Sequence, residues 1–289
     1  MIRIGIIGTE SSHAGAFSQI INCPRSDFAD MHVAALYGPD RATAEAVADV
    51  CGGACIADSL QKLTAQVDAV MITARKRSLH YAYALPLIEQ KMPLFIDKPL
   101  TCSVEQAEKL LERARLLGVP ILGGSGCKLS EELRALSAKV AAMRKTGELI
   151  SASMCYAADP DSPYDGFWFY GSHLVEMALE VFGYEVKSVG AVQNGKTITA
   201  LLRYADLDIT LVFSPGVQVP SCTVFSKKET ILTEIPVGPI YRNTVEAFAA
   251  MLRTGRMPFS YGKLLAPVKV IDGILQALQQ NAQIRIHVV

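Results

Sequence analysis

Lys98 is the first residue whose type and place suit chemistry on a bound molecule. It lies in Phe95-Ile96-Asp97-Lys98-Pro99, at the end of an apolar run that we predict to be a parallel strand. Ligands of open α/β sheets bind at the carboxyl ends of the strands. Pro99 disfavours the helical region for the residue before it, so we expect the Lys98 ammonium group to point beyond the sheet edge. The alternative interpretation is an ordinary surface lysine.

The stretch GTESSHAGAF, residues 8–17, could bind phosphate. It follows the apolar run 1–7, at the place where a dinucleotide-binding protein turns from its first strand into its first helix. When the fingerprint GxGxxG is aligned on Gly8, Glu10 and His13 stand in place of the second and third glycines. The Glu10 carboxylate would repel phosphate and could itself accept the free N–H groups of the helix start.

Neighbouring residues partly restore this site. Ser11 and Ser12 can donate hydroxyl hydrogen bonds to phosphate, and Gly15 can supply close helix packing one or two residues late. The alternative interpretation of His13 is a polar residue on the first helical turn. We therefore predict a nucleotide site that is retained but unusual.

The end of the second strand bears on the choice of cofactor. Gly38 occupies the place where NAD-specific proteins carry an acidic residue for the adenosine ribose. Arg41 follows, and arginine can accommodate a 2′-phosphate, which favours NADP slightly over NAD. Asp40 could instead supply the missing carboxylate, so both cofactors stay open.

Three consecutive cations, Arg75-Lys76-Arg77, follow the apolar run 67–73, which we predict to be a strand near the middle of the sheet. At the carboxyl end of a strand they could grip an anionic substrate or a phosphate. The other interpretation is a solvated basic loop.

Residues 1–123 alternate short apolar runs with segments of helix length, which predicts a doubly wound parallel sheet. We place the domain boundary after residue 123, where Gly123-Gly124-Ser125-Gly126 is flexible in composition. The predicted strands cover 2–8, 33–37, 67–73, 93–96 and 120–122, with 54–57 as a weaker one. The predicted helices are 41–50, capped by Asp40, then 78–90, and a run opened by Ser103.

Residues 124–289 indicate an α+β domain with a mostly antiparallel, open-faced sheet. Helices are predicted over 130–145 and 172–182, and strands over 186–192, 197–204, 207–213 and 217–226. Asn194-Gly195 predicts a type I′ hairpin turn. Two helices end the chain: one has Tyr241, Val245, Phe248 and Leu252 on its apolar face, and the other covers about 263–280.

Bulk composition excludes several classes of function. The 28 basic and 28 acidic residues balance, so no net field draws the 289-residue chain to nucleic acid or to an anionic membrane. No uninterrupted apolar run approaches the roughly 18–20 residues that span a bilayer, and the N-terminus does not resemble a signal peptide, so we expect a cytoplasmic protein.

The seven scattered cysteines are expected to be reduced. Cys51 and Cys55, with no second pair nearby, predict buried small hydrophobes and no metal site.

Residues 67–110, VDAVMITARKRSLHYAYALPLIEQKMPLFIDKPLTCSVEQAEKL, show an apolar strand, a loop ending in His, a helix and then Asp-Lys-Pro. This order resembles the glucose–fructose oxidoreductase, inositol dehydrogenase and rhizopine catabolism (Gfo/Idh/MocA) family, in which the last motif is Glu-Lys-Pro. The resemblance continues through Gly171-Ser172-His173 and the segment 248–258, and it covers nearly the whole chain. It implies a Rossmann domain that binds NAD or NADP, a C-terminal substrate domain, and a homodimer or homotetramer.

The resemblance also implies roles for single residues. Lys98 matches the family lysine that contacts the nicotinamide ribose and the reacting oxygen, where its charge stabilises a developing alkoxide. His173 matches the catalytic histidine, and its place at the start of a predicted helix favours a neutral ring, which Glu176 could counter. The residues assigned to the cofactor are Gly8, Thr9, Glu10, Ser11, Ser12, Arg41, Thr73, Ala74, His80 and Lys98. For His80 the residues themselves favour a structural hydrogen-bonding role.

One departure from the family pattern concerns proton transfer. The family commonly carries an Asp four residues before the histidine, where this chain has Phe169. A phenyl ring cannot relay protons, and Asp165 or Tyr170 are the candidate substitutes. The aromatic run 167–170 could otherwise close the domain interface or form a wall for a ligand with an apolar face.

Three functions follow from these residues. The first is hydride transfer between NAD(P) and a sugar, cyclitol or related polyol, with an anionic polyol as an open alternative. The second is a catalytically degenerate family member that binds a metabolite or acts as a regulatory protein, which Glu10, His13 and Phe169 favour. The third keeps the cofactor but performs a net non-redox reaction, such as an epimerisation through a transient ketone.

Overall fold

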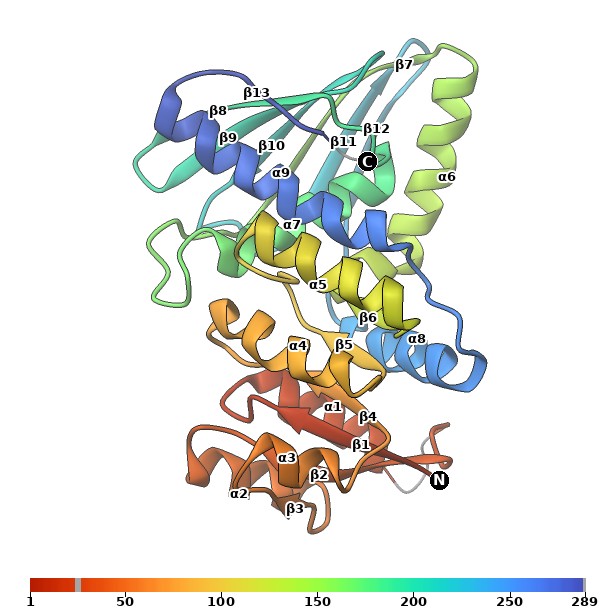
Figure 1. Cartoon of the computed structure of the whole chain (residues 1–289). Coiled ribbons are helices and arrows are strands. Elements are labelled where there is room, and N and C mark those ends of the chain that lie inside the picture. Colours follow the sequence, from red (N-terminus) through yellow and green to blue (C-terminus); the bar gives the residue numbers. More distant parts are fainter. Residues whose placement is uncertain (24–26, 288–289) are drawn as a thin grey trace. The chain divides into compact units, whose positions relative to one another are not determined.

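The computed structural model describes residues 1–23 and 27–287, which form two compact units (Figure 1). The first unit comprises Met1–Thr101, Glu105–Gly124 and Tyr241–Tyr261, and the second comprises Cys102–Val104, Ser125–Ile240 and Gly262–Val289. The sequence-based boundary assigned 241–261 to the second domain. This segment belongs to the first unit because its helix packs its apolar face there: the Phe248 ring contacts Phe95, and Tyr241 contacts Phe17.

The first unit contains a six-stranded sheet in the order β3-β2-β1-β4-β5-β6. Every neighbouring pair is parallel, which confirms the predicted doubly wound sheet. Strands β4, β5 and β6 are buried at every residue and therefore read as continuous apolar runs. Their bounds are β1 Ile2–Ile7, β2 Met31–Tyr37, β3 Cys55–Ile56, β4 Ala69–Ile72, β5 Leu94–Ile96 and β6 Ile121–Gly123.

Polar side chains start the helices of the first unit. Ser11 caps the helix after β1, and Asp40 accepts a hydrogen bond from the Ala42 N–H at 3.0 Å, as predicted for the next helix. The bounds are α1 Ser12–Asn22, α2 Arg41–Val50, α3 Leu60–Thr64, α4 His80–Glu89, α5 Val104–Leu117 and α8 Ile240–Thr254, with a 3₁₀ turn, η1, at Arg77–Leu79. The short α3 was not predicted from the sequence.

The strand order reverses between β1 and β4, and the backbone after these two strands comes into close contact. Gly8 has a φ of 97°, and a Cβ placed on it would lie 2.2 Å from the Ala74 nitrogen. Only glycine fits this position without a shift of the backbone. The crevice beside such a reversal is where open α/β sheets bind ligands.

The second unit contains a seven-stranded sheet in the order β12-β11-β7-β10-β9-β8-β13. The pairing is antiparallel except between β7 and β10, so the predicted, mostly antiparallel sheet is confirmed. The strands are β7 Leu149–Tyr156, β8 Ser188–Asn194, β9 Thr197–Arg203, β10 Asp208–Phe213, β11 Ser221–Ser226, β12 Thr230–Glu234 and β13 Ile284–Arg285.

Three helices pack on one face of this sheet and share its apolar core (Figure 1). They are α6 Glu131–Lys145, α7 Trp168–Phe182 and α9 Tyr261–Gln280, and the 3₁₀ turn η2, Gly126–Leu129, precedes them. The helix predicted over 172–182 begins four residues earlier than expected. Gly171 lies inside it because the Phe167 ring occupies the space of a side chain, only 2.9 Å from where a Cβ on Gly171 would lie.

The β8–β9 hairpin is present, but its turn differs from the prediction. Asn194 pairs with Thr197, so the two central residues are Gly195 and Lys196. Gly195 has a φ of 57°, whereas Lys196 is not among the described non-glycine residues with positive φ. A type I′ turn needs positive φ at both positions, so the type I′ assignment is wrong.

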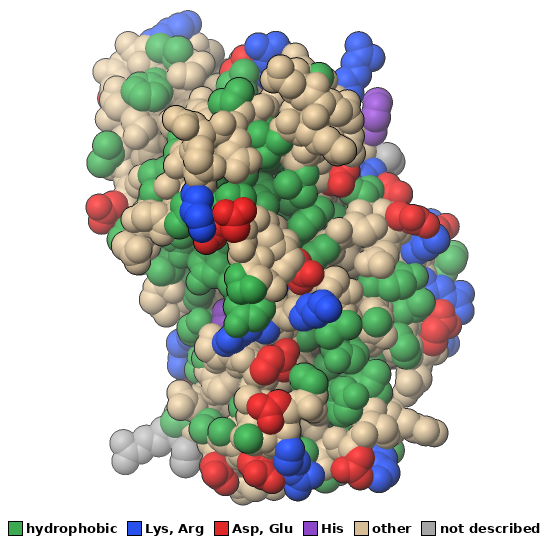
Figure 2. Space-filling model, turned by 90° about the vertical axis from the view of Figure 1, so that its left-hand side faces the viewer, with side chains coloured by type: hydrophobic (Ala, Val, Ile, Leu, Met, Phe, Trp, Pro, Cys, Tyr) green, Lys and Arg blue, Asp and Glu red, His purple; other side chains and the backbone are tan. Residues whose placement is uncertain are grey.

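Charged side chains of both signs are interspersed over the face of the molecule seen in Figure 2. Within the described ranges, no helix is long and apolar enough to cross a membrane.

All seven cysteines are free thiols, and Cys55 is exposed, so its interpretation as a buried hydrophobe is wrong. Groups of three or more His, Cys, Asp or Glu that could hold a metal ion are absent from residues 1–23 and 27–287.

The contact at Gly8 predicts a difference between two glycine variants. Gly8→Ala should lower the free energy of unfolding by about 2–4 kcal/mol, because alanine is strained at positive φ and its Cβ meets the Ala74 backbone. Gly15→Ala in α1 should raise it by about 0.5–1 kcal/mol, because a Cβ there meets no atom within 4 Å. Urea unfolding measures both, and equal effects of the two substitutions would contradict this packing.

Candidate functional site

The turn after β1 is tied to β4 by backbone and side-chain hydrogen bonds. The Thr73 N–H donates to the Ile7 carbonyl at 2.7 Å, and the Thr73 hydroxyl lies 3.1 Å and 3.0 Å from the carbonyl oxygens of Ile7 and Gly8. The Gly8 N–H donates to Tyr37 on β2 at 2.8 Å. Thr73 is fully buried, so its hydroxyl holds the turn in place. The assignment of Thr73 to the cofactor site stays a prediction.

Glu10 reaches from this turn to the loop after β4. One carboxylate oxygen accepts the Arg75 N–H at 2.8 Å, while the other is buried without a hydrogen-bond partner. Ser11 caps α1 by accepting the His13 N–H at 3.3 Å. The expectation that Glu10 takes the N–H groups of the helix start is therefore wrong, because Ser11 is the cap and Glu10 spans the two loops beside the switch point.

The other turn residues divide into buried and exposed groups. Thr9 is buried, with its hydroxyl 3.0 Å from the Thr43 hydroxyl, whereas Ser12 is exposed on the first turn of α1. A Cβ on Gly38 would lie 2.1 Å from the Thr9 hydroxyl. Packing against Thr9 therefore explains why no acidic side chain stands at this place.

One further sequence-based expectation is wrong in this part of the chain. Gly15 was expected to pack closely, yet a Cβ there would meet no atom within 4 Å. Arg41, predicted to accommodate a 2′-phosphate, is exposed and pairs with Glu45 at 2.9 Å, one turn later on α2. Asp40 caps α2.

A buried carboxylate, Asp97, follows β5 and contacts two basic side chains. Its Oδ2 lies 3.0 Å from Arg77 Nη1 and 2.8 Å from His13 Nδ1, although the His13 contact is poorly directed for a hydrogen bond. Burial alone would raise the pKa of Asp97, but His13 and Arg77 outweigh it and hold this pKa well below its usual range. The charge of Lys98 acts in the same direction.

Within the basic loop, Arg77 has a role that neither interpretation offered. Arg77 is only 2% exposed, and besides Asp97 it donates to the Ala74 carbonyl at 2.8 Å. It is therefore the counter-ion of a buried carboxylate, and its neighbour Lys76 is the exposed cation. Lys98 is also 2% exposed, so the alternative of an ordinary surface lysine is wrong.

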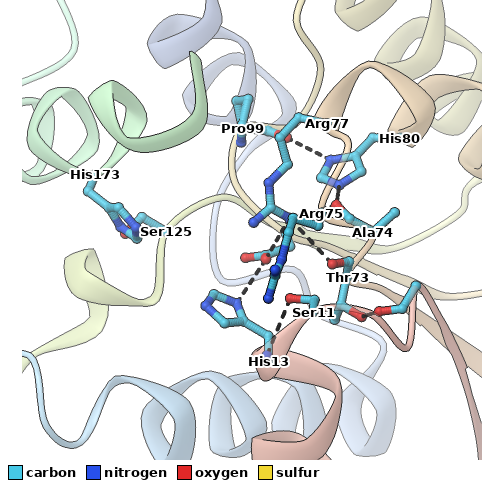
Figure 3. A network of polar contacts seen from close by, with 12 residues as sticks. Ser11, His13, Thr73, Ala74, Arg75, Arg77, His80, Pro99, Ser125 and His173 are labelled. Atoms are coloured by element: carbon cyan, nitrogen blue, oxygen red, sulfur yellow. Dashed lines mark hydrogen bonds and ion pairs between the residues drawn. The ribbon is translucent and has the colours of Figure 1, made fainter. Parts of the chain in front are cut away.

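His80 is a buried link between two loops. Its Nδ1 lies 2.8 Å from the Pro99 carbonyl and its Nε2 lies 3.0 Å from the Ala74 carbonyl (Figure 3). Burial, followed by the charge of Arg77, lowers the pKa of His80 to about 4. Because both nitrogens contact backbone carbonyls, His80 has the structural hydrogen-bonding role that the sequence favoured, and its assignment to the cofactor stays a prediction.

In the second unit, His173 lies on the second turn of α7 beside the η2 turn. Its Nδ1 is 2.7 Å from the Ser125 hydroxyl (Figure 3) and 3.5 Å from the Cys127 sulfur. Because α7 begins at Trp168, the expectation that a helix start keeps this ring neutral is wrong. Ser125 is a hydrogen-bonding partner of His173 that was not predicted from the sequence, because its place in a glycine-rich stretch indicated only a flexible linker.

Glu176, one turn after His173, fixes the η2 turn. It accepts the Ser125 N–H at 2.9 Å and the Lys128 ammonium at 2.7 Å, and both side chains of this ion pair are buried. Glu176 was expected to act on the histidine, but its two carboxylate oxygens are engaged by Ser125 and Lys128. A buried ion pair with both charges satisfied is a rigid support.

The Ser125 hydroxyl fixes the orientation of the His173 ring. The oxygen accepts the Cys127 N–H at 3.1 Å and lies 2.7 Å from Nδ1 of His173, so it can donate to an unprotonated Nδ1 or accept from a protonated one. Ser125 is 1% exposed, so this contact keeps a buried hydroxyl hydrogen-bonded in either tautomer.

Phe169 stacks among aromatic rings. Its ring centroid lies 5.0 Å from that of Tyr164 and 5.2 Å from that of Tyr170, and the Tyr170 ring lies 5.1 Å from the His173 ring. Of the two proposed substitutes for the family carboxylate, only Tyr170 has a ring contact to His173 among the contacts described.

The low pKa of His80 predicts a pH dependence of stability. The pKa is about 4 in the folded chain and about 6.5 unfolded, so the unfolded chain takes up the proton first as the pH falls. His80 should thus destabilise the wild type by about 2 kcal/mol between pH 7.5 and pH 5, relative to His80→Gln. Urea unfolding at both pH values measures the difference, and parallel pH curves for the two proteins would contradict the assignment.

Known proteins share the sequence pattern of the first unit. Residues 2–124 match the model of the oxidoreductase family Gfo/Idh/MocA, NAD-binding Rossmann fold. Inositol 2-dehydrogenases from two strains of Corynebacterium glutamicum are 31% identical over 121 residues, which are 41% of this chain. The match spans 34% of the length of these relatives.

Solved structures resemble the chain over nearly its full length. A putative myo-inositol dehydrogenase from Sinorhizobium meliloti has a TM-score of 0.82 at 18% identity, covering 99% of this chain and 100% of that one. A myo-inositol dehydrogenase from C. glutamicum scores 0.81 at 16% identity, with 99% of each chain covered. The WlbA dehydrogenase from Bordetella pertussis, in complex with NADH and UDP-GlcNAcA, scores 0.79 at 15% identity, with 100% and 98% covered. These likenesses show the fold, and the match over residues 2–124 identifies that segment as an NAD-binding Rossmann domain of the Gfo/Idh/MocA oxidoreductase type.

Proposed function

We propose that the chain is an NAD(P)-dependent oxidoreductase that transfers hydride to or from a sugar, cyclitol or related polyol. The observation that carries this proposal is the Gly8 turn, which leads from β1 into α1 at the switch point of a family Rossmann domain. The curated relatives that match this domain are inositol 2-dehydrogenases. Because the match covers about a third of their length, the activity is inferred from the site and not taken over from them.

The residues of the turn fit a dinucleotide. Gly8 leaves no room for a Cβ, and the N–H groups at the start of α1 point to where phosphates bind in such folds. Gly8, Thr9, Ser11 and Ser12 would hold the pyrophosphate. Bound NAD(P) would supply or accept the hydride.

Thr73, Ala74 and His80 would hold the dinucleotide indirectly. All three are buried, and they keep the loop after β4 in place beside the turn. Arg41 would lie on the adenosine side of the site. Its pairing with Glu45 and the NAD-binding family model leave the lean toward NADP without support, so both cofactors have to be tested.

Lys98 and His173 would act on the substrate oxygen. The Lys98 ammonium would stabilise the negative charge that develops on the alkoxide. His173 would exchange the proton of the reacting hydroxyl, with Ser125 as a partner that can either donate to Nδ1 or accept from it. A hydroxyl partner therefore fits a ring that changes its protonation state during turnover.

An anionic substrate has less support than the sequence indicated. Arg77, which was one of three candidate cations, is neutralised by Asp97. A homodimer or homotetramer remains part of the proposal. It is supported by the exposed apolar side chains Ile150, Phe225 and Leu232 on strands of the second unit.

The alternative, a catalytically degenerate protein that binds a metabolite or regulates a partner, rests on Glu10. Its carboxylate brings a negative charge to the edge of the turn that would receive two phosphates. This alternative predicts metabolite binding without hydride transfer.

Turnover with a substrate panel tests the proposed function. The full chain is incubated with NAD⁺ or NADP⁺ and with cyclitols, aldoses and glycosides, and nicotinamide reduction is followed. Lys98→Met should lower kcat by about 100-fold or more, because the alkoxide loses its cation. Lys76→Met, which removes an exposed cation, is the control and should keep the wild-type rate. Wild-type kcat in Lys98→Met would contradict the role of Lys98.

The Glu10 carboxylate predicts an effect on affinity that needs no substrate. Glu10→Gln keeps an oxygen that can accept the Arg75 N–H but removes the charge, so it should tighten NADH binding by about tenfold. Fluorescence titration measures the Kd, and Glu89→Gln, which changes an exposed carboxylate at the end of α4, is the control. Weaker binding by Glu10→Gln would instead mean that the buried oxygen accepts a hydrogen bond from the ribose.

A further inference from the structure

The second unit contains a pocket with a volume of about 380 Å³. Its wall comes from the end of β7, the loop that follows, the first turn of α7 and the loop after β10. The lining residues whose chemistry bears on a ligand are Tyr156, Asp159, Tyr164, Phe169, Tyr170 and Gln218. This volume is at the lower end of the range of small-molecule sites and suits a single ring with its substituents.

Aromatic rings form much of the pocket wall. The Phe169 ring stands between those of Tyr164 and Tyr170, with centroid distances of 5.0 Å and 5.2 Å, and Tyr170 lies 6.3 Å from Tyr156. The Tyr170 side chain is partly exposed although it is large and aromatic. Such walls favour a ligand that offers a flat, apolar face.

Two of the residues that line the pocket also contact the His173 ring. The ring centroids of Tyr156 and Tyr170, which line the pocket, lie 6.0 Å and 5.1 Å from that of His173. A molecule in the pocket would therefore reach the aromatic side chains that enclose this histidine.

The charge of the pocket excludes an anionic group as its preferred ligand. Asp159 is the charged residue among the described side chains that line it, and it pairs with Lys196 at 3.1 Å. A carboxylate or phosphate would thus meet aromatic faces and a negative side chain, with no lining cation among the described residues to offset its desolvation.

We propose that this pocket binds a neutral ring with an apolar face, which is carried as a substituent by the substrate. The ring would be either the C–H face of a second sugar or an aryl group. The assignment of that substituent to a substrate rests on the proposed function, whereas binding in the pocket does not. Phe169 is then a specificity-determining residue: it contacts the ring of the ligand where a carboxylate would bind hydroxyl groups.

Ligand binding to the full chain, without a dinucleotide, tests the pocket. Calorimetric titrations compare methyl β-D-glucopyranoside with cellobiose and with phenyl β-D-glucopyranoside, which present a second sugar face and an aryl face. Cellobiose, the phenyl glucoside or both should bind about tenfold or more tightly than the methyl glycoside. Tighter binding of cellobiose would identify the preferred ring as a second sugar, and tighter binding of the phenyl glucoside would identify it as an aryl group. Phenyl β-D-glucuronide should bind no tighter than the phenyl glucoside.

Two matched variants locate the binding. Phe169→Leu keeps an apolar side chain and should abolish the preference for the second ring, whereas Phe225→Leu removes an exposed phenyl ring of β11 and should leave it unchanged. Thermal unfolding of each variant checks that it is folded. Equal affinities for all four ligands in the wild type, or an unchanged preference in folded Phe169→Leu, would overturn the proposal.

The outcome for the pocket is separable from that for the oxidoreductase. A ring preference without nicotinamide reduction supports the pocket and contradicts the proposed activity. Turnover of small polyols with no ring preference supports the activity and overturns the pocket.

Discussion

The candidate nucleotide site depends on a close approach of two pieces of backbone. Where β1 and β4 end, the space beside Gly8 is already occupied by Ala74, and the Thr73 hydroxyl holds the two chain segments together. The chain therefore has to leave β1 in a conformation with positive φ, which directs it into α1. The position of the helix start, and with it any phosphate site, follows from this contact. Glu10 then bridges the loops on the two sides of the crevice.

Buried charges support the candidate residues in each unit separately. In the first unit, Asp97 precedes Lys98 and is neutralised by Arg77, with the His13 ring also in contact, which keeps the loop after β5 ordered around a charge that cannot be left unpaired. In the second, Glu176 holds the η2 turn through Lys128 and so presents Ser125 to His173. Both arrangements place a structural ion pair next to a candidate catalytic group.

The alternation of apolar runs with helix-length segments was sufficient to predict the parallel sheet. Strands that helices cover on both faces are apolar along their length, and each is followed by the helix that leads to the next strand. Caps such as Asp40 located helix starts for the same local reason. Contacts between distant segments could not be predicted: Arg77 with Asp97, Glu10 with Arg75, and Ser125 with His173 all join loops that are far apart in sequence. Gly171 misled the prediction of α7, because the need for glycine comes from the Phe167 ring packed against it. Lys98 and His173 were identified by family motifs, and their environments came only from the structure.

The most direct measurement is a titration of the wild-type chain with NADH and with NADPH, following nicotinamide fluorescence and the thermal unfolding temperature in the same samples. We predict saturable binding of at least one of them, together with a rise in unfolding temperature, because the Gly8 turn and the start of α1 remain available although Glu10 is nearby. Absence of binding by both, in protein shown to be folded, would contradict the central claim that this turn still holds a dinucleotide.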